Sequence, residues 1–121
     1  MARKAALILL LAAACWGHHS FKAEYDSDKP VHLKGVVTRF DFINPHAEIF
    51  LDVDGVRWWI EGASPQMLVR RGISKTSLPV GTRVVIDGFQ SKSTPHRAIG
   101  RAVTFPDGRK ISLDASSSGL E

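Results

Sequence analysis

Alternating hydrophobic and polar positions predict a β-hairpin in the middle of the chain. Two alternating runs, 46–53 and 56–61, flank the dipeptide Asp54-Gly55. This dipeptide favours a type I′ turn, because such a turn needs positive φ at both central residues. The turn fixes the register of the two strands. The expected cross-strand pairs are Val53 with Val56, Leu51 with Trp58, Ile49 with Ile60, Phe50 with Trp59, Asp52 with Arg57 and Glu48 with Glu61.

A longer run, 31–42, precedes the hairpin and extends it to a three-stranded meander through the turn Asn44-Pro45-His46. The alternation of this run changes parity at Gly35, and a glycine at such a change suggests a bulge where a long strand bends. The register expected between this strand and the next is Phe40 to Ile49, Thr38 to Leu51 and Asp41 to Glu48.

The second half of the chain predicts one short helix and three more strands. Ser64 suits the N-cap, Pro65 the first helical position and Gly72 a left-handed C-cap, which together indicate a helix of about two turns. Alternating runs and turn residues place the further strands at 82–89, 98–105 and 110–113.

This order of elements is that of the oligonucleotide/oligosaccharide-binding (OB) barrel, in which a helix follows the third of five strands. The sequence therefore predicts an all-β domain with one short helix, folded as a small five- to six-stranded OB-like barrel. Strand order alone does not prove that the sheet closes. Another small β-barrel or a β-sandwich therefore stays open as an alternative.

The first residues have the pattern of an export signal. A basic start is followed by an apolar run of ten residues, 5–14, which is too short for a bilayer span of about 20 residues. Cleavage after Gly17, the cut that we prefer, leaves His18 first in a periplasmic protein. Cleavage before Cys15 would instead resemble a bacterial lipoprotein signal. The expected divisions are a signal peptide at 1–17, an amino-terminal arm at 18–30, the barrel at 31–114 and a disordered tail at 115–121.

The charge balance argues against a nucleic-acid partner. The net charge is +4, and it becomes +2 when Arg3 and Lys4 leave with the signal peptide. The remaining charges alternate in sign, whereas a nucleic-acid-binding domain clusters its basic residues. Cleavage after Gly17 also leaves no cysteine, so neither a disulfide nor a thiolate site is available.

Several short motifs resemble those of a family of small exported bacterial proteins of unknown function. They are His18-His19-Ser20-Phe21, Asn44-Pro45-His46, Ile60-Glu61-Gly62-Ala63-Ser64-Pro65 with Arg70-Arg71-Gly72 after it, and Pro106-Asp107-Gly108-Arg109. The resemblance covers nearly the whole chain after the signal peptide and implies export. It implies no activity and no catalytic residues.

The polar face of the meander gathers acidic residues into a row. Asp41, Glu48 and Glu61 line up across the three strands, and His46 lies two residues before Glu48 on the same face. Like charges opposite one another destabilise a sheet, so they need compensation. A metal ion bound by His46, Glu48 and Glu61, a nearby arginine, or solvent exposure would each provide it. The candidate arginines are Arg39, Arg70 and Arg101.

The histidines at the expected mature start are candidate copper ligands. If His18 is first, its amine and imidazole can chelate one copper(II) ion, with His19 or His46 completing the site. Copper(II) is the strongest divalent competitor for nitrogen ligands. If Gly17 is retained, a histidine at position three beside a free amine favours a square-planar copper(II) or nickel(II) site. The alternative is that the two histidines have no metal-related role.

An aromatic pair suggests a different binding function. Phe50 and Trp59 share the outer face of the hairpin, and OB-like barrels stack sugars or bases on exposed aromatic residues of their central strands. We therefore consider an organic ligand or an exported protein partner, bound through Phe50, Trp59 and Arg101 with the loop at 91–96. The helix or the amino-terminal arm could instead cover the pair.

Recognisable catalytic arrangements are missing from the sequence. No serine lies in a nucleophile elbow, and no glycine-rich phosphate loop follows a strand. Asp41, Glu48, Glu61 and His46 could transfer protons, but the sequence indicates no cleft around them. We therefore expect a small non-enzymatic binding protein, with copper(II) as its candidate cofactor.

Overall fold

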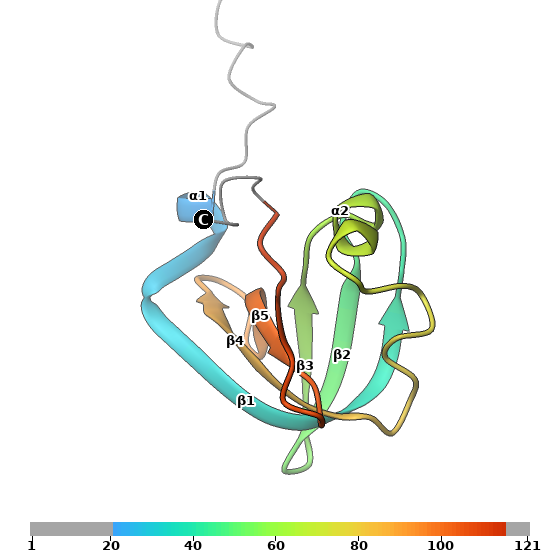
Figure 1. The fold of residues 1–121 in the computed structure, drawn as a ribbon. Helices are drawn as coiled ribbons and strands as arrows, with labels where there is room; N and C mark the ends of the chain where they lie inside the picture. Colours follow the sequence, from blue (N-terminus) through green and yellow to red (C-terminus); the bar gives the residue numbers. More distant parts are fainter. Residues whose placement is uncertain (1–20, 116–121) are drawn as a thin grey trace, which may run out of the picture.

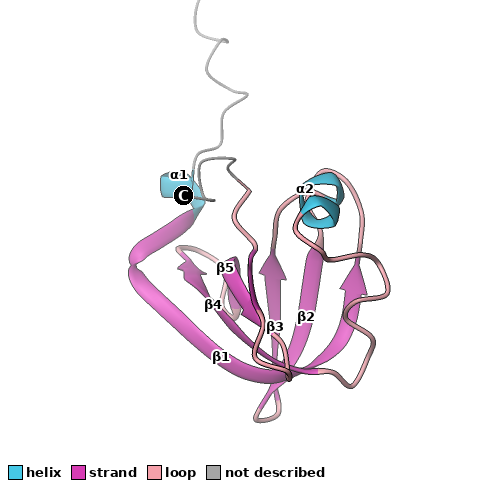
Figure 2. Cartoon of the chain, in the orientation of Figure 1, coloured by secondary structure: helices cyan, strands magenta, loops and turns pink. Residues whose placement is uncertain are grey.

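A computed structural model describes residues 21–115, which form a strongly curved sheet with a short helix at one end (Figure 1 and Figure 2). The expected signal peptide, His18, His19 and residues 116–121 lie outside this described part. The elements are α1 (Phe21–Glu24), β1 (Tyr25–Asp41), β2 (Glu48–Val53), β3 (Val56–Glu61), α2 (Pro65–Arg70), β4 (Arg83–Ser91), β5 (Arg97–Thr104) and β6 (Lys110–Ser112).

The sheet closes on itself and confirms the predicted OB-like barrel. Its strand order is β3-β2-β1-β4-β5-β6, and an additional parallel pairing joins β3 to β5. The first five strands therefore form a ring, because β1 also pairs with both β2 and β4. The short β6 pairs with β5 alone among the described strands. The closing β3–β5 pairing rules out the alternative of an open β-sandwich.

The inside of the barrel is filled by aliphatic side chains from alternating strand positions. The largest fully buried ones on strands are Val37, Ile49, Leu51, Ile60, Ile86 and Val103. Leu68 of α2 belongs to the same buried cluster, so the helix contributes to the core at its end of the barrel. The apolar face predicted for the hairpin is the face that points inward.

The β2–β3 hairpin has the predicted turn and register. All six expected pairs form, from Glu48 with Glu61 at one end to Val53 with Val56 at the other. Asp54 and Gly55 adopt positive φ values of 53° and 87°, as a type I′ turn requires.

β1 begins six residues earlier than the sequence pattern indicated. Residues 25–30, which were expected in the arm, belong to β1, and its pairing with β4 starts with Tyr25 opposite Ser91 and resumes at Pro30 opposite Phe89. Tyr25 is buried, whereas the residues from Ser27 to Pro30 are exposed. Only one side chain of this segment is therefore buried, and one buried residue produces no alternation that a sequence pattern could reveal.

The bend in β1 lies at Thr38, so its prediction at Gly35 was wrong. The register shifts between Val37 and Arg39, and Val37 rather than Thr38 lies opposite Leu51. The Thr38 hydroxyl donates a hydrogen bond to a backbone carbonyl of β2, which stabilises the bulge. The other two predicted pairs, Phe40 with Ile49 and Asp41 with Glu48, are confirmed.

Gly35 has a different role, which is to let β1 and β2 approach closely. A Cβ atom at this position would lie 2.8 Å from the carbonyl oxygen of Asp52 and 2.9 Å from a methyl group of Val53. Such distances are too short for any side chain, so this position requires glycine.

Helix α2 has both predicted caps. The Ser64 hydroxyl accepts a hydrogen bond from the first turn, and Gly72 follows the helix with a φ of 97°. Arg71 also fixes the carboxyl-terminal part of the chain, because its Nη1 donates to the backbone oxygens of Ser112 at 3.1 Å and Asp114 at 2.8 Å.

Candidate functional site

An aromatic pair lies on the outer face of β2 and β3. The rings of Phe50 and Trp59 are nearly parallel, with an interplanar angle of 9° and centroids 6.2 Å apart. Trp59 keeps 36% of its surface exposed. Its Nε1 donates a 2.7 Å hydrogen bond to Glu48, which holds the indole ring in place. The predicted outward orientation of the pair is therefore correct.

Two arginines lie over these rings. The guanidinium carbon of Arg97 is 3.6 Å from the centre of the Trp59 ring, and that of Arg39 is 5.5 Å from the centre of the Phe50 ring. Both distances allow attraction between a cation and the electron-rich ring face. Across the strands, the outer face therefore carries Arg39, Phe50, Trp59 and Arg97 in this order. We call these four residues the outer-face cluster.

Arg97 is also half of a largely buried ion pair with Glu61. Its Nη2 lies 2.8 Å from Glu61 Oε1, and the two side chains are only 16% and 15% exposed. The parallel β3–β5 pairing places Arg97 directly opposite Trp59, which explains how the first residue of β5 reaches this face. The second terminal nitrogen of Arg97 is buried and has no hydrogen-bond partner among residues 21–115.

Glu61 joins the outer-face cluster to two further residues. Its Oε1 also accepts a 2.8 Å hydrogen bond from the Tyr25 hydroxyl, and its Oε2 lies 3.7 Å from Nε2 of His46. Burial, followed by the hydrogen bond and the negative charge of Glu61, raises the pKa of Tyr25 above its ordinary value. The tyrosine therefore stays neutral and acts as a hydrogen-bond donor.

The row of acidic residues predicted from the register exists, and each carboxylate has its own partner. Asp41 pairs with Nε of Arg39 at 2.8 Å, while Glu48 bonds to Trp59 and Glu61 to Arg97. Arg39 was one of the predicted compensating residues, and Arg97 was not. Hydrogen bonds and cations thus offset the repulsion that adjacent carboxylates would otherwise cause.

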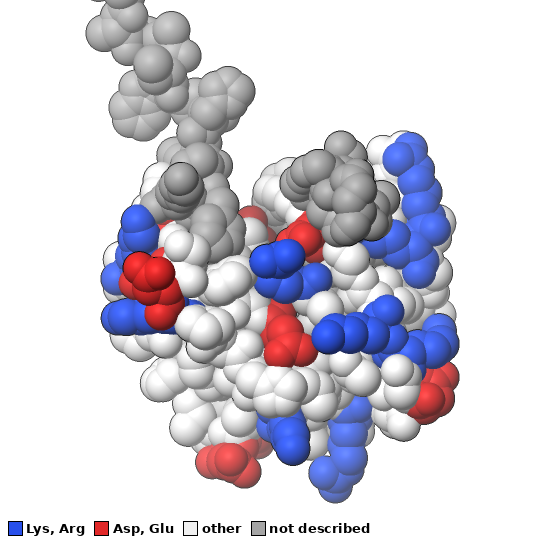
Figure 3. All heavy atoms as spheres, turned by 60° about the vertical axis from the view of Figure 1, so that its left-hand side comes forward, with Lys and Arg blue, Asp and Glu red and all other residues white. Residues whose placement is uncertain are grey.

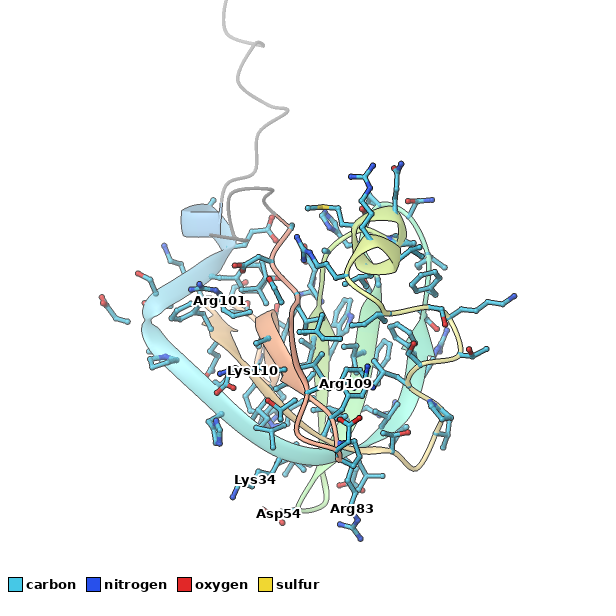
Figure 4. The ribbon with its side chains drawn as sticks, in the orientation of Figure 1. Lys34, Asp54, Arg83, Arg101, Arg109 and Lys110 are labelled. Carbon is cyan, nitrogen blue, oxygen red and sulfur yellow. The ribbon has the colours of Figure 1, made fainter. Side chains whose placement is uncertain are left out.

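Arg101, predicted to join the aromatic pair, has other neighbours. Its Nε lies 3.0 Å from Asp114, and its guanidinium is 5.7 Å from the centre of the Phe89 ring (Figure 4). The arginine that contacts Trp59 is Arg97.

The predicted metal ligands of the meander are only partly brought together. His46 lies near Glu61, whereas Glu48 is held by Trp59. Residues 21–115 contain no group of three or more histidine, cysteine, aspartate or glutamate side chains that could hold a metal ion. His18 and His19 lie outside the described residues, so the copper site at the amino terminus stays a prediction.

Sequence reasoning missed Tyr25 and Arg97, which complete the site. Tyr25 stands alone in a polar segment, and Arg97 follows a polar loop, so neither belongs to a recognisable motif. The topology of the barrel could have indicated Arg97. Because the third and fifth strands pair in such a ring, the first residue of the fifth strand was a candidate neighbour of Trp59.

Charges of both signs are interspersed on the face of the molecule drawn in Figure 3. Among the described residues, no helix has the length and hydrophobicity needed to cross a membrane.

The closed sheet and its outer-face cluster define a small OB-like barrel protein. The chain belongs to a family of unknown function, DUF6152, whose family model matches residues 6–100. Neither a curated protein nor a solved structure gives a significant match to the chain. The match to the family model therefore confirms the predicted membership of a family of unknown function.

Proposed function

We propose that the protein is a small exported, non-enzymatic binding protein that takes an organic ligand or a protein partner on its outer-face cluster. The single observation that supports this proposal is Trp59, an exposed indole held between Phe50 and Arg97. OB-like barrels use the face of their second and third strands, with two flanking loops, to stack ring-shaped groups. Trp59 is on that face, and Arg97 follows the second of those loops.

The contacts of the outer-face cluster support binding by a preorganised site. Hydrogen bonding to Glu48 holds the indole, and the ion pair with Glu61 holds Arg97. A ligand that binds here meets side chains already fixed in position, which lowers the entropy cost of binding.

The test is an NMR titration of the indole Nε1–H signal of Trp59. Two probes, maltohexaose and benzoate, represent a sugar ring and an aromatic anion. We expect a saturable shift of the Trp59 signal with at least one probe, and the accompanying backbone amide shifts should be lost in Trp59→Leu. Val80→Ala, which trims a side chain that is 74% exposed, is the matched control. Identical titrations of Trp59→Leu and the control, followed at backbone amides, would reject this face as the site.

A second candidate function is copper(II) binding at the amino terminus. It is supported by His18-His19, the first residues after the preferred cleavage site. His46 offers a third nitrogen, because its side chain is 40% exposed. Tyr25, which is bonded to Glu61 beside His46, also lies only six residues after His19 in the sequence.

The free amine of His18 provides the sharpest test of this second function. Calorimetry compares the protein starting at His18 with a form that carries one extra residue before it. The extension keeps every side chain and displaces only the amine, so affinity should fall more than about tenfold, or ~1.4 kcal/mol. Equal affinities would reject the terminal chelate. Binding that survives the extension and disappears in His46→Ala would move the site to the meander.

Export to the periplasm is part of the proposal. The basic start and the short apolar run support it, and we further propose that the His18-His19-Ser20-Phe21 start and the Asn44-Pro45-His46 turn are characteristic of the family. Intact mass of the exported protein tests the cleavage site. A measured mass that matches a chain starting at a lipidated Cys15 would show that the mature protein is attached to the membrane and is not the soluble periplasmic form.

A further inference from the structure

A hollow of about 460 Å³ lies at the end of the barrel away from α2, beside the β2–β3 turn (Figure 4). Its lining includes Lys34, Asp54 and Arg83, and it shares no residue with the outer-face cluster. Its volume falls within the range of about 300–1,000 Å³ that is typical of small-molecule sites.

Strand register explains how charged and apolar groups meet in this hollow. Val36 of β1 lies opposite Asp52 of β2 on one side and Arg83 of β4 on the other. In the neighbouring row, Lys34 lies opposite Val85. Residues directly opposite one another share a face of the sheet. Asp52, Val36 and Arg83 therefore form one row across three strands, in which the half-buried valine separates the two charges. Lys34 and the half-buried Val85 lie in the next row.

The two cations are placed to act together. Lys34 and Arg83 are diagonal neighbours across β1 and β4, within reach of one another for long side chains. Neither side chain forms an ion pair or hydrogen bond within residues 21–115. Both are therefore available to a carboxylate.

The acids lie on β2 and in the turn that follows it. Asp52 accepts a 2.7 Å hydrogen bond from the Gly55 amide, and Asp54 is exposed in the adjoining turn. β2 and β4 are separated by two strand spacings, about 10 Å. The lining is therefore neutral overall, with its two acids on the β2 side and its two cations on β1 and β4.

We propose that this hollow binds a short peptide with free termini, or a similar zwitterion whose two charges are several bonds apart. The carboxylate lies between Lys34 and Arg83, the ammonium group lies against Asp54, and the apolar side chains cover Val36 and Val85. A simple anion would be repelled by the two acids. An α-amino acid would be too short to reach both sides.

Three dipeptides test the proposal, because they differ only in their charged ends. NMR titrations of the labelled protein use dileucine, N-acetyl-dileucine and dileucine amide, and follow the amides of Lys34, Val36 and Val85. Each charge lost from the peptide should weaken binding about fivefold, the effect of an ion pair near the surface. Dileucine should therefore bind more tightly than either capped form.

Two protein variants assign the ends of the peptide. Arg83→Gln should remove most of the preference for dileucine over its amide, and Asp54→Asn most of the preference over the acetylated form. Asparagine tolerates the positive φ of residue 54. Lys75→Gln, an exposed cation outside the hollow, should leave all three affinities unchanged.

Other results would overturn the proposal. Equal affinities for the three peptides would show a purely apolar contact. Tightest binding of the acetylated peptide would show a simple anion site, and no shift of the three amides would show that the hollow takes no peptide. These outcomes are independent of the Trp59 titration, so failure here leaves the outer-face cluster untouched.

Discussion

Replacing Glu61 by glutamine tests how much the buried ion pair contributes to stability. The closest atoms of Glu61 and Arg97 are 2.8 Å apart, and both side chains are at least 84% buried. At an effective dielectric constant of about 20, two unit charges at this distance attract by about 6 kcal/mol. The loss of water around both groups offsets most of this attraction.

The glutamine variant keeps the shape of the side chain but leaves the arginine charge unpaired in the interior. Removing one partner of a buried pair costs about 3–5 kcal/mol. Arg97 would still contact the face of Trp59, and it is not completely buried. We therefore expect Glu61→Gln to lower the free energy of unfolding by about 2–4 kcal/mol.

Urea unfolding followed by far-ultraviolet circular dichroism measures this loss. Tryptophan fluorescence is less suitable, because movement of Arg97 would change the emission of Trp59 directly. Glu48→Gln is the matched control, since glutamine can still accept the Trp59 hydrogen bond, and we expect it to change stability by less than about 0.5 kcal/mol. The double variant Glu61→Leu with Arg97→Leu should recover stability relative to Glu61→Leu alone, because no charge remains buried. A cost for Glu61→Gln no greater than that of the control would refute the buried-pair argument.

Three further perturbations test the fold. Gly55→Val forces a β-branched residue into positive φ and should cost about 1–3 kcal/mol in urea unfolding, whereas an unchanged midpoint would contradict the type I′ turn. Gly35→Ala should cost about 1–3 kcal/mol, since its new methyl group meets the Asp52 carbonyl at 2.8 Å; wild-type stability would show that β1 and β2 separate freely. Because the folded-state pKa of Tyr25 is raised, the unfolded chain ionises first and stability should fall above pH of about 10, by up to ~1.4 kcal/mol per pH unit. Tyr25→Phe should reduce this slope, and an unchanged slope would assign it to other groups.

The sequence was most informative where side chains alternate between core and solvent. The register of β2 and β3 followed from Asp54-Gly55 and two alternating runs, and it correctly placed Phe50 beside Trp59. A two-residue turn leaves little freedom, so local chemistry determined the non-local pairing. The caps of α2 were predictable for the same reason.

Features that depend on closure of the barrel were not predictable in this way. Arg97 meets Trp59 only because β5 pairs with β3, and Tyr25 reaches Glu61 only because β1 extends along β4. The bend at Thr38 was missed because Gly35, nearby, offered a plausible local cause. Gly35 is needed instead for the close approach of β1 to β2, a contact between strands that a parity pattern does not encode.

The parallel pairing of β3 with β5 also has a consequence for the order of folding. Trp59 and Arg97 are partners in the sheet although a complete helix and strand lie between them in the chain. Such distant contacts form late, because a long loop must be ordered before they contribute stability. The local β2–β3 hairpin can form early, before Arg97 covers the indole ring of Trp59. A nascent chain that ends before residue 97 therefore has the aromatic pair without its covering cation, and the outer face acquires its final chemistry only when the barrel closes.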